Sequence, residues 1–384
     1  MPSEGLSDPM AISKTPATVV PPRPAAQGAP FAHRSSWRAA LSVALTTSYI
    51  VAGLFLFALA LQLMKGGAGG LKPILQALSV HGPVNTLGFG WLGAYTVMSG
   101  SPVAAISLSL FSKGTISDIE AFAMINGSRL GASFIVLFVG FILYAAHRRS
   151  ADGLFIGAVA LITAFTLWLP VLPIGILVLE SGWLDSVRLG TPPGVASLIT
   201  LVFDPIVHRA DDHLPALTLF ALGIAVLVAA FTVFDRALPN LEQPSLRVGR
   251  IKQWLHHPIA MFGLGLGLTA LTMSVSLSVT LLIPLSLKGY VRRENIIPYI
   301  MGANISTWVD TLAAAVLLNT PRAFTIVFTE MIIGAAVSLA VLLLFYRPYA
   351  QAVLALAKAV THSRNGFALF LVAIFFLPLV LFLS

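Results

Sequence analysis

Cysteine is missing from this sequence of 384 residues, so disulfide bonds, thiolate metal sites and cysteine nucleophiles are excluded. Charged residues are scarce as well, at 10% of the chain against about 25% in soluble domains. With 57% hydrophobic residues and a mean hydropathy of +0.90, the chain carries more apolar surface than a soluble fold can bury. This composition indicates an integral membrane protein, whose apolar surface lies in a lipid bilayer.

Long apolar runs supply candidate membrane-spanning segments. They approach or exceed the roughly 20 residues that cross a hydrocarbon core, and they lie at 41–62, 152–179, 214–234 and 326–346. A lipid-exposed backbone must satisfy its own hydrogen bonds, and strand-like alternation is missing, which leaves helices. We therefore predict an all-α polytopic protein of the plasma (inner) membrane, in contact with membrane lipid.

The beginning of the chain differs from the rest. Residues 1–35 hold seven prolines together with Ser, Gly and Ala, which predicts a disordered N-terminal tail. The apolar segment at about 38–63 is too long for a signal peptide, so we expect it to be retained. The net charge of +8 could indicate nucleic acid, but in a membrane protein it is typical of cytoplasmic loops. No nucleic-acid partner is expected.

A constant offset of 175 residues aligns the two halves of the chain. Residues 81–133 and 256–308 share 12 identities in 53 positions, where composition alone gives roughly four. The matches include Gly, Pro, Ser and Met rather than only the apolar residues that any two membrane helices share. We predict two copies of one unit, repeat 1 over 36–208 and repeat 2 over 211–384.

The distribution of Lys and Arg predicts that the two copies are inverted. With a cytoplasmic N-terminus, three crossings in repeat 1 and a re-entrant hairpin in each repeat, sixteen Lys and Arg lie inside and six outside. This asymmetry is expected of a correctly oriented chain. Inverted repeats with broken helices are a signature of secondary transporters. Whether 194–207 and 369–382 cross the membrane stays open, as does the oligomeric state.

Each repeat carries two polar islands in apolar sequence. The first islands read YTVMSGSPVAAIS and LTALTMSVSLSVT, and glycines precede both. Helix breaks at such positions expose backbone N–H groups that favour an anion, and serine hydroxyls add donors. The second islands, INGSRLGAS and IMGANISTWVD, follow at the same spacing in both repeats. The alternative for a single serine is close helix packing through small residues.

Arg129 and Asp310 are the ionisable residues that stand out inside apolar segments. Intramembrane charges are costly and functional by default. Arg129 could grip an oxyanion at two points, or it could reach outward or pair with Asp118, Glu120 or Asp310. Asp310 could pair with Arg129, help to bind a cation or carry a proton.

The other acidic residues near predicted helix ends are expected in loop or capping roles; they are Glu330, Asp204 and Glu180. No metal-ligand spacing, nucleophile elbow or phosphate-binding loop occurs in the sequence. Neither catalysis, a resident metal nor an organic cofactor is therefore expected.

The doubled pattern resembles the type II sodium–phosphate cotransporter family. That family has two inverted repeats, each with a Gln-Ser-Ser-Ser motif after a Thr and a later Gly-Ala-Asn-Ile-Gly-Thr motif. In repeat 2, TALTMSVS (269–276) and MGANIST (301–307) are similar to these motifs, and in repeat 1 AYTVMSGS (94–101) and GSRLGAS (127–133) correspond to them. The resemblance covers about residues 38–350.

The resemblance implies a substrate site and a cation site. By analogy, phosphate contacts fall on Ser99, Ser101, Ser274 and Ser276, to which we add Arg129. The cation contacts fall by analogy on Thr269, Asn304 and Thr307, and to these we add Ser306 and Asp310.

The departures from the family pattern affect both sites. Met98 and Met273 stand where the family has Gln, and thioethers cannot replace the amide hydrogen bonds. Arg129 stands where the family has Asn. We hypothesise that its fixed charge replaces one bound cation, so that fewer sodium ions accompany each substrate than is usual for the family.

The function expected from the sequence is secondary active transport of a small inorganic anion. Sodium-coupled phosphate transport by alternating access is the main hypothesis, with Na⁺ as the coupling ion. The alternatives are another oxyanion or a small carboxylate with proton coupling, a membrane-embedded enzyme acting on lipid phosphates, and a relic of the family that no longer transports.

Overall fold

The structure is a computed structural model, which describes residues 34–145, 151–237, 257–272, 275–280 and 291–384. The chain divides into two units, Met1–Ala44 and Leu45–Ser384, and the boundary falls within the first helix. The second unit carries the features that concern function. Residues 1–33 of the predicted tail lie outside the described residues, and helix α1 begins at Arg34.

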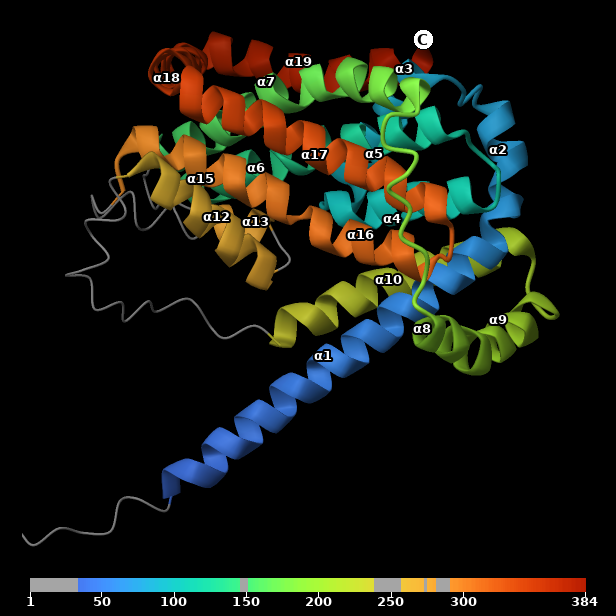
Figure 1. Ribbon diagram of the computed structural model, residues 1–384. Coiled ribbons are helices and arrows are strands. Elements are labelled where there is room, and N and C mark those ends of the chain that lie inside the picture. Colours follow the sequence, from blue (N-terminus) through green and yellow to red (C-terminus); the bar gives the residue numbers. More distant parts are fainter. Residues whose placement is uncertain (1–33, 146–150, 238–256, 273–274, 281–290) are drawn as a thin grey trace, which may run out of the picture. The chain divides into compact units, whose positions relative to one another are not determined.

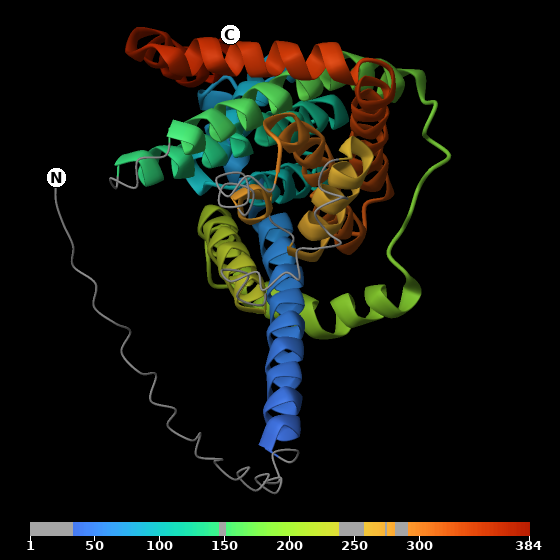
Figure 2. The same ribbon diagram turned by 90° about the vertical axis from the view of Figure 1, so that its left-hand side faces the viewer.

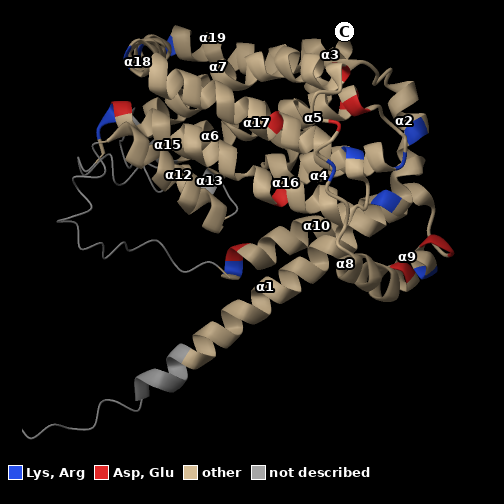
Figure 3. Cartoon of the chain, in the orientation of Figure 1, with Lys and Arg blue, Asp and Glu red and all other residues tan. Residues whose placement is uncertain are grey.

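Every regular element in the described part of the chain is a helix, and no strand occurs there. Lys, Arg, Asp and Glu gather mainly at helix ends and connections (Figure 3). Seven of the described helices are long and apolar enough to cross a membrane: 40–77, 118–142, 153–181, 216–237, 293–317, 321–344 and 364–383. This confirms the predicted all-α polytopic membrane protein.

The first half of the chain contains two long helices, α1 and α7, and a set of shorter ones (Figure 1). Its elements are α1 (Arg34–Gly67), η1 (Ala68–Leu71), α2 (Lys72–Ala77), α3 (Pro83–Val97), α4 (Gly100–Ser112), α5 (Asp118–Ala132), α6 (Phe134–Ala145), α7 (Ala151–Ser181), α8 (Pro193–Leu198), the π-helical η2 (Ile199–Phe203) and α9 (Asp204–Asp211).

The second half follows a related order. Its elements are α10 (Ala216–Ala237), α12 (Pro258–Thr272), α13 (Val275–Thr280), α15 (Arg293–Ser306), α16 (Trp308–Leu317), α17 (Pro321–Leu344), α18 (Tyr346–His362) and α19 (Arg364–Leu383). Figures 1 and 2 show α19 at one edge of the second unit, along α3, and α10 at the opposite edge.

Glycines bring equivalent helices together in both halves. α3 packs on α5, and α12 packs on α15. A Cβ on Gly90 would overlap the carbonyl oxygen of Met124, and a Cβ on Gly265, 175 residues later, would overlap that of Tyr299. Lipid supplies no hydrophobic force between helices, so close backbone contact of this kind holds such a pair together.

The glycines on the facing helices repeat the same relation. A Cβ on Gly127 of α5 would overlap the carbonyl oxygen of Leu87, and one on Gly302 of α15 would overlap that of Phe262. The offset is again 175 residues. The two halves therefore share one helix pair with glycine at the same two positions, as the predicted duplication would give.

Several helices are broken or short. The turn between α3 and α4 places Met98 in the left-handed region, at φ 54°, and Ser99 in an extended conformation. With 15 and 13 residues, α3 and α4 are each only about 20 Å long, less than the roughly 30 Å core. This fits the predicted re-entrant hairpin. Equivalent breaks separate α5 from α6 at Ser133 and α15 from α16 at Thr307.

Side chains at one end of the second unit show how the helices run. Arg322, near the start of α17, donates through Nη2 to Oδ2 of Asp118 at the start of α5, at 2.8 Å. Lys65 Nζ donates to the carbonyl oxygen of Leu318, at the end of α16, at 2.7 Å. α5 thus begins on the side where α16 ends. Inverted repeats would have this arrangement, and the inversion itself stays a prediction.

We predict that Gly265→Ala destabilises the protein by about 1–3 kcal/mol, the range for overpacking a tight contact. The control is Gly263→Ala in the same helix, where a Cβ would meet nothing within 4 Å. There the better helix propensity of Ala should leave stability unchanged or raise it by up to ~1 kcal/mol. Thermal unfolding of both variants in detergent checks this, and equal midpoints would contradict the packing described.

Candidate functional site

A cavity of 340 Å³ lies between the two halves of the chain. Its size is at the lower end of the range for small-molecule sites, about 300–1,000 Å³. Three pairs of its lining residues are related by the 175-residue offset, namely Gly100 with Val275, Arg129 with Asn304, and Ala132 with Thr307. The cavity therefore sits where equivalent parts of the two halves meet.

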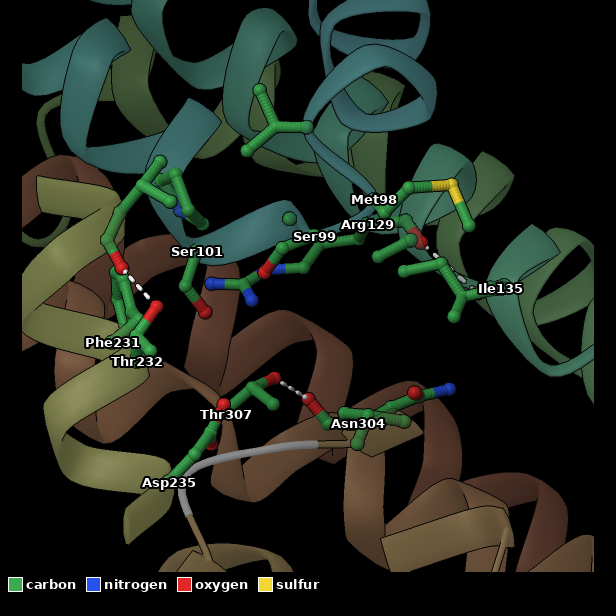
Figure 4. Close-up of a pocket in the computed structure, with 17 residues that line it drawn as sticks. Met98, Ser99, Ser101, Arg129, Ile135, Phe231, Thr232, Asp235, Asn304 and Thr307 are labelled. Carbon is green, nitrogen blue, oxygen red and sulfur yellow. Dashed lines mark hydrogen bonds between the residues drawn. The ribbon is translucent and has the colours of Figure 1, made fainter. Parts of the chain in front are cut away.

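Five of the ten predicted site residues line this cavity. Ser99 and Ser101, where α4 begins, lie with Arg129 of α5 along one side (Figure 4). Asn304 of α15 and Thr307 of the following turn face them from the opposite side (Figure 4). The structure thus brings together residues from the first island of repeat 1 and from the second islands of both repeats.

Two of the predicted cation contacts lie elsewhere. The Thr269 hydroxyl donates to Ser278 Oγ at 2.6 Å, and Ser278 in turn bonds Tyr299 Oη at 2.7 Å. This chain of hydroxyls joins α12, α13 and α15. Ser306 is buried and donates to the carbonyl oxygen of Ala303 at 3.1 Å. Both hydroxyls are engaged in bonds between or within helices and do not line the cavity.

Two predicted substrate contacts lie outside the described residues. They are Ser274 and the side chain of Ser276. Met273, which stands at the position of the family's Gln in repeat 2, also lies there.

The first turn of α4 faces the cavity. Its N-cap residue Ser99 makes no side-chain cap, so the Ser99 hydroxyl does not satisfy the backbone N–H groups of that turn. These groups and the helix dipole favour a negative charge. Met98, which precedes them and also lines the cavity, has a left-handed backbone that costs about 1–2 kcal/mol for a residue with a Cβ. Strain of this kind is concentrated at functional sites.

Arg129 is buried, with 6% of its surface exposed. Its Cζ lies 3.9 Å from the centroid of the Trp308 ring, a cation–π contact. Nη2 donates to Thr311 Oγ1 at 2.7 Å, and that hydroxyl donates to Asp310 Oδ1 at 3.0 Å. Nε has no hydrogen-bond partner among the described residues. Arg129 therefore does not reach outward, and within the described part of the chain it forms no direct ion pair; Thr311 connects it to Asp310.

The other acids proposed as partners of Arg129 are engaged elsewhere. Asp118 pairs with Arg322. Glu120 accepts hydrogen bonds from the backbone N–H groups of Gly82 at 2.8 Å and Ser117 at 2.7 Å, which closes the capping box of α5. Asp310, by contrast, is 4% exposed and lies in hydrogen-bonding range of Ser101, which lines the cavity.

The expectation that Glu330 lies near a helix end is wrong. α17 begins at Pro321 rather than at the apolar run from 326, which puts Glu330 about two and a half turns into the helix. Its side chain is fully buried, beside Asn126 and within electrostatic range of Arg129. Asp204 does begin α9, and Glu180 is next to the end of α7, as expected.

α10 supplies cavity residues that the sequence analysis missed. One face of this helix, at spacing i, i+3, i+4 and i+7, contributes Val228, Phe231, Thr232 and Asp235 to the wall (Figure 4). Thr232 and Asp235 on a common face near the end of an apolar helix were a usable signal. Thr311 and Trp308, which surround Arg129, follow directly after the GANIST motif and were also overlooked.

The two sides of the cavity offer different chemistry. The α4 side presents hydroxyls, uncapped N–H groups and a guanidinium, which are donors suited to an oxyanion. The opposite side presents the Asn304 amide, the Thr307 hydroxyl and the Asp235 carboxylate, which include oxygens suited to a hard cation. No group of three or more His, Cys, Asp or Glu residues that could hold a metal ion occurs in the described part.

We predict that Thr311→Val destabilises the protein by about 1–3 kcal/mol, since it leaves Arg129 Nη2 and Asp310 Oδ1 buried without their shared partner. Thr200→Val is the control, because the exposed Thr200 hydroxyl bonds the carbonyl oxygen of Ala196, four residues earlier in the chain; a change within about 0.5 kcal/mol is expected. Thermal unfolding measures both, and a neutral Thr311→Val would show that the hydroxyl does not stabilise the pair.

No family model, no curated protein and no solved structure matches this chain. What the protein does must therefore be inferred from its own residues and their geometry.

Proposed function

We propose that the protein is a secondary active transporter of a small anion, with phosphate as the first candidate and alternating access as the mechanism. One observation carries the proposal. In a chain with seven helices fit to cross a membrane, a cavity between equivalent helices combines Arg129, two serine hydroxyls and an uncapped helix start. Secondary transporters place their binding sites at the interface of such repeats.

An oxyanion fits the donors on the α4 side. A guanidinium presents its N–H groups in a planar fork that matches two oxygens of a phosphate or carboxylate. Nε of Arg129 still lacks a partner in the described part. Ser99 and Ser101 add hydroxyl donors at the same wall. Arg129 is already held on Trp308 and Thr311, so little ordering is required when the anion binds.

Burial of the site favours transport over the enzyme alternative. An enzyme that acts on lipid phosphates would present its ionisable groups at the membrane surface, where the head group lies. Here the guanidinium is 6% exposed and Asp310 4% exposed. The reading as a non-transporting relic is disfavoured because the donors still converge on one cavity.

Sodium coupling is part of the proposal on the strength of the resemblance. The oxygens of Asn304, Thr307 and Asp235 line the side of the cavity that faces Arg129. Arg129 and Asn304 occupy equivalent positions in the two repeats, so the amide in one repeat corresponds to a fixed cation in the other. This supports the hypothesis that Arg129 replaces one sodium ion.

The test is uptake of radiolabelled phosphate into proteoliposomes of the purified chain, with an inward sodium gradient or with potassium in its place. We expect sodium-dependent accumulation. Arg129→Gln should lower it about tenfold or more, because a charged hydrogen bond contributes about 1.5–3 kcal/mol. Ser99→Ala should lower it severalfold. Ser197→Ala, a matched change on the exposed face of α8, should leave it unaltered.

Two results would count against the proposal. Absence of phosphate uptake under sodium, potassium and proton gradients would exclude phosphate and direct the same assay to sulfate and small carboxylates. Full uptake by Arg129→Gln would show that the anion does not bind in this cavity.

A further inference from the structure

Glu330 is a buried carboxyl for which anion binding in the cavity provides no role. It lies within the apolar helix α17, is 0% exposed and does not line the cavity. Neither of its carboxyl oxygens has a hydrogen-bond partner in the described part of the chain. A carboxylate left in this condition inside a membrane protein is costly, and such groups are functional by default.

Asn126, which neighbours Glu330, also has an oxygen without a hydrogen-bond donor. The Asn126 side chain lies in hydrogen-bonding range of the Glu330 carboxyl. Its Nδ2 donates to the carbonyl oxygen of Trp168 at 3.2 Å, while its Oδ1 has no partner among the described residues. The two carboxyl oxygens of Glu330 and Oδ1 of the neighbouring Asn126 are therefore three buried acceptors that have no hydrogen-bond donor among the described residues.

Few charged groups act on Glu330. Arg129 of α5 is the charged group that acts on it, and Asp310 of α16 acts on the same guanidinium. The helices α4 and α7, which also pack on α17, carry no ionisable side chain over 100–112 and 153–179. The ionisable residues of α15 and α18 are not among the groups whose charge acts on Glu330. They are Arg293, Glu294, Tyr299, Tyr346, Arg347, Tyr349, Lys358 and His362.

We propose that Glu330 is a proton-binding site, and that its proton is taken up together with the anion that binds at Arg129. A proton from water adds to one carboxyl oxygen of Glu330, and the new O–H donates to Oδ1 of Asn126. A single proton thus supplies the donor that both residues lack. The coupling half of this inference rests on the proposed anion transport, whereas the proton site itself does not.

A proton fits this place better than a metal ion. Hard cations take six or more oxygen ligands, whereas the acceptors identified here belong to two side chains. The guanidinium of Arg129 also lies close enough to act on Glu330, and its positive charge would repel a metal cation. A proton needs only one lone pair and leaves the group neutral.

The count of charges links the proton to the anion. With both acids ionised, Arg129, Asp310 and Glu330 together carry one positive and two negative charges, so the buried group repels an anion in the cavity. A proton on Glu330 makes the group neutral overall and restores the attraction of Arg129 for the anion. By linkage, the bound anion must in turn favour protonation of Glu330 to the same extent.

The first experiment measures binding of radiolabelled inorganic phosphate to the purified full chain between pH 5.5 and 8.5 at constant sodium. Glu330→Gln mimics the protonated acid, and the ratio of its affinity to that of the unaltered protein cancels the titration of phosphate itself. We expect this ratio to rise with pH by up to about tenfold per unit, the limit for one linked proton. Glu294→Gln, an exposed change on α15, should show no such rise. A ratio independent of pH would overturn the coupling.

The second experiment detects the proton without reference to any ligand. Without phosphate, the infrared carbonyl stretch of a protonated carboxylic acid should grow in the unaltered protein as the pH falls from 8.5 to 5.5, should be missing from Glu330→Gln and should persist in Glu294→Gln. Glu330→Gln should also unfold no earlier than the unaltered protein. If the band is missing at neutral and acidic pH, or if Glu330→Gln loses stability as a broken ion pair would, the proton site is wrong. If the band is present but phosphate does not bind, the proton site stands and the proposed substrate fails.

Discussion

The positive charge of Arg129 has to be stabilised inside a membrane-spanning helix, and the polar groups around the cavity are arranged to meet that requirement. A charge at this depth is expensive unless it is paired or hydrogen-bonded. Trp308 supplies a ring face, Thr311 an acceptor, and Asp310 the compensating charge beyond the hydroxyl. Because these partners come from α16 and the Arg from α5, the requirement also joins the two halves of the chain across the cavity.

The two halves share a glycine-packed helix pair but carry different side chains at the cavity. The glycine contacts of α3 with α5 and of α12 with α15 recur at a fixed offset, since only a residue without Cβ permits those approaches. At the cavity the equivalent positions carry Arg129 in one half and Asn304 in the other. Equivalent positions can thus keep their helix packing while one half carries a guanidinium and the other a neutral amide.

Features that depend on neighbouring residues could be predicted from the sequence, whereas features that depend on contacts between distant helices could not. Helices, breaks and glycine positions could be predicted, because composition, spacing and self-similarity are properties of the chain itself. The convergence of Ser99, Arg129 and Asn304 could be anticipated from the repeat. The role of Thr311 and the wall formed by α10 could not, since they depend on how distant helices pack. Glu330 was misplaced because the start of α17 at Pro321 is set by Thr320 and Pro321 rather than by the apolar run.

Direct contact is not needed for the cavity and the buried acids to influence each other. Two unit charges 4 Å apart interact by about 4 kcal/mol at an effective dielectric constant of 20, and by only about 1 kcal/mol in water. An anion beside Arg129 and the carboxyls of Asp310 and Glu330 therefore draw on the same positive charge from opposite sides. In an exposed site solvent would screen them from one another. Burial, which makes Arg129 expensive to keep, is also what would make the proposed anion binding and the ionisation of the carboxyls interdependent.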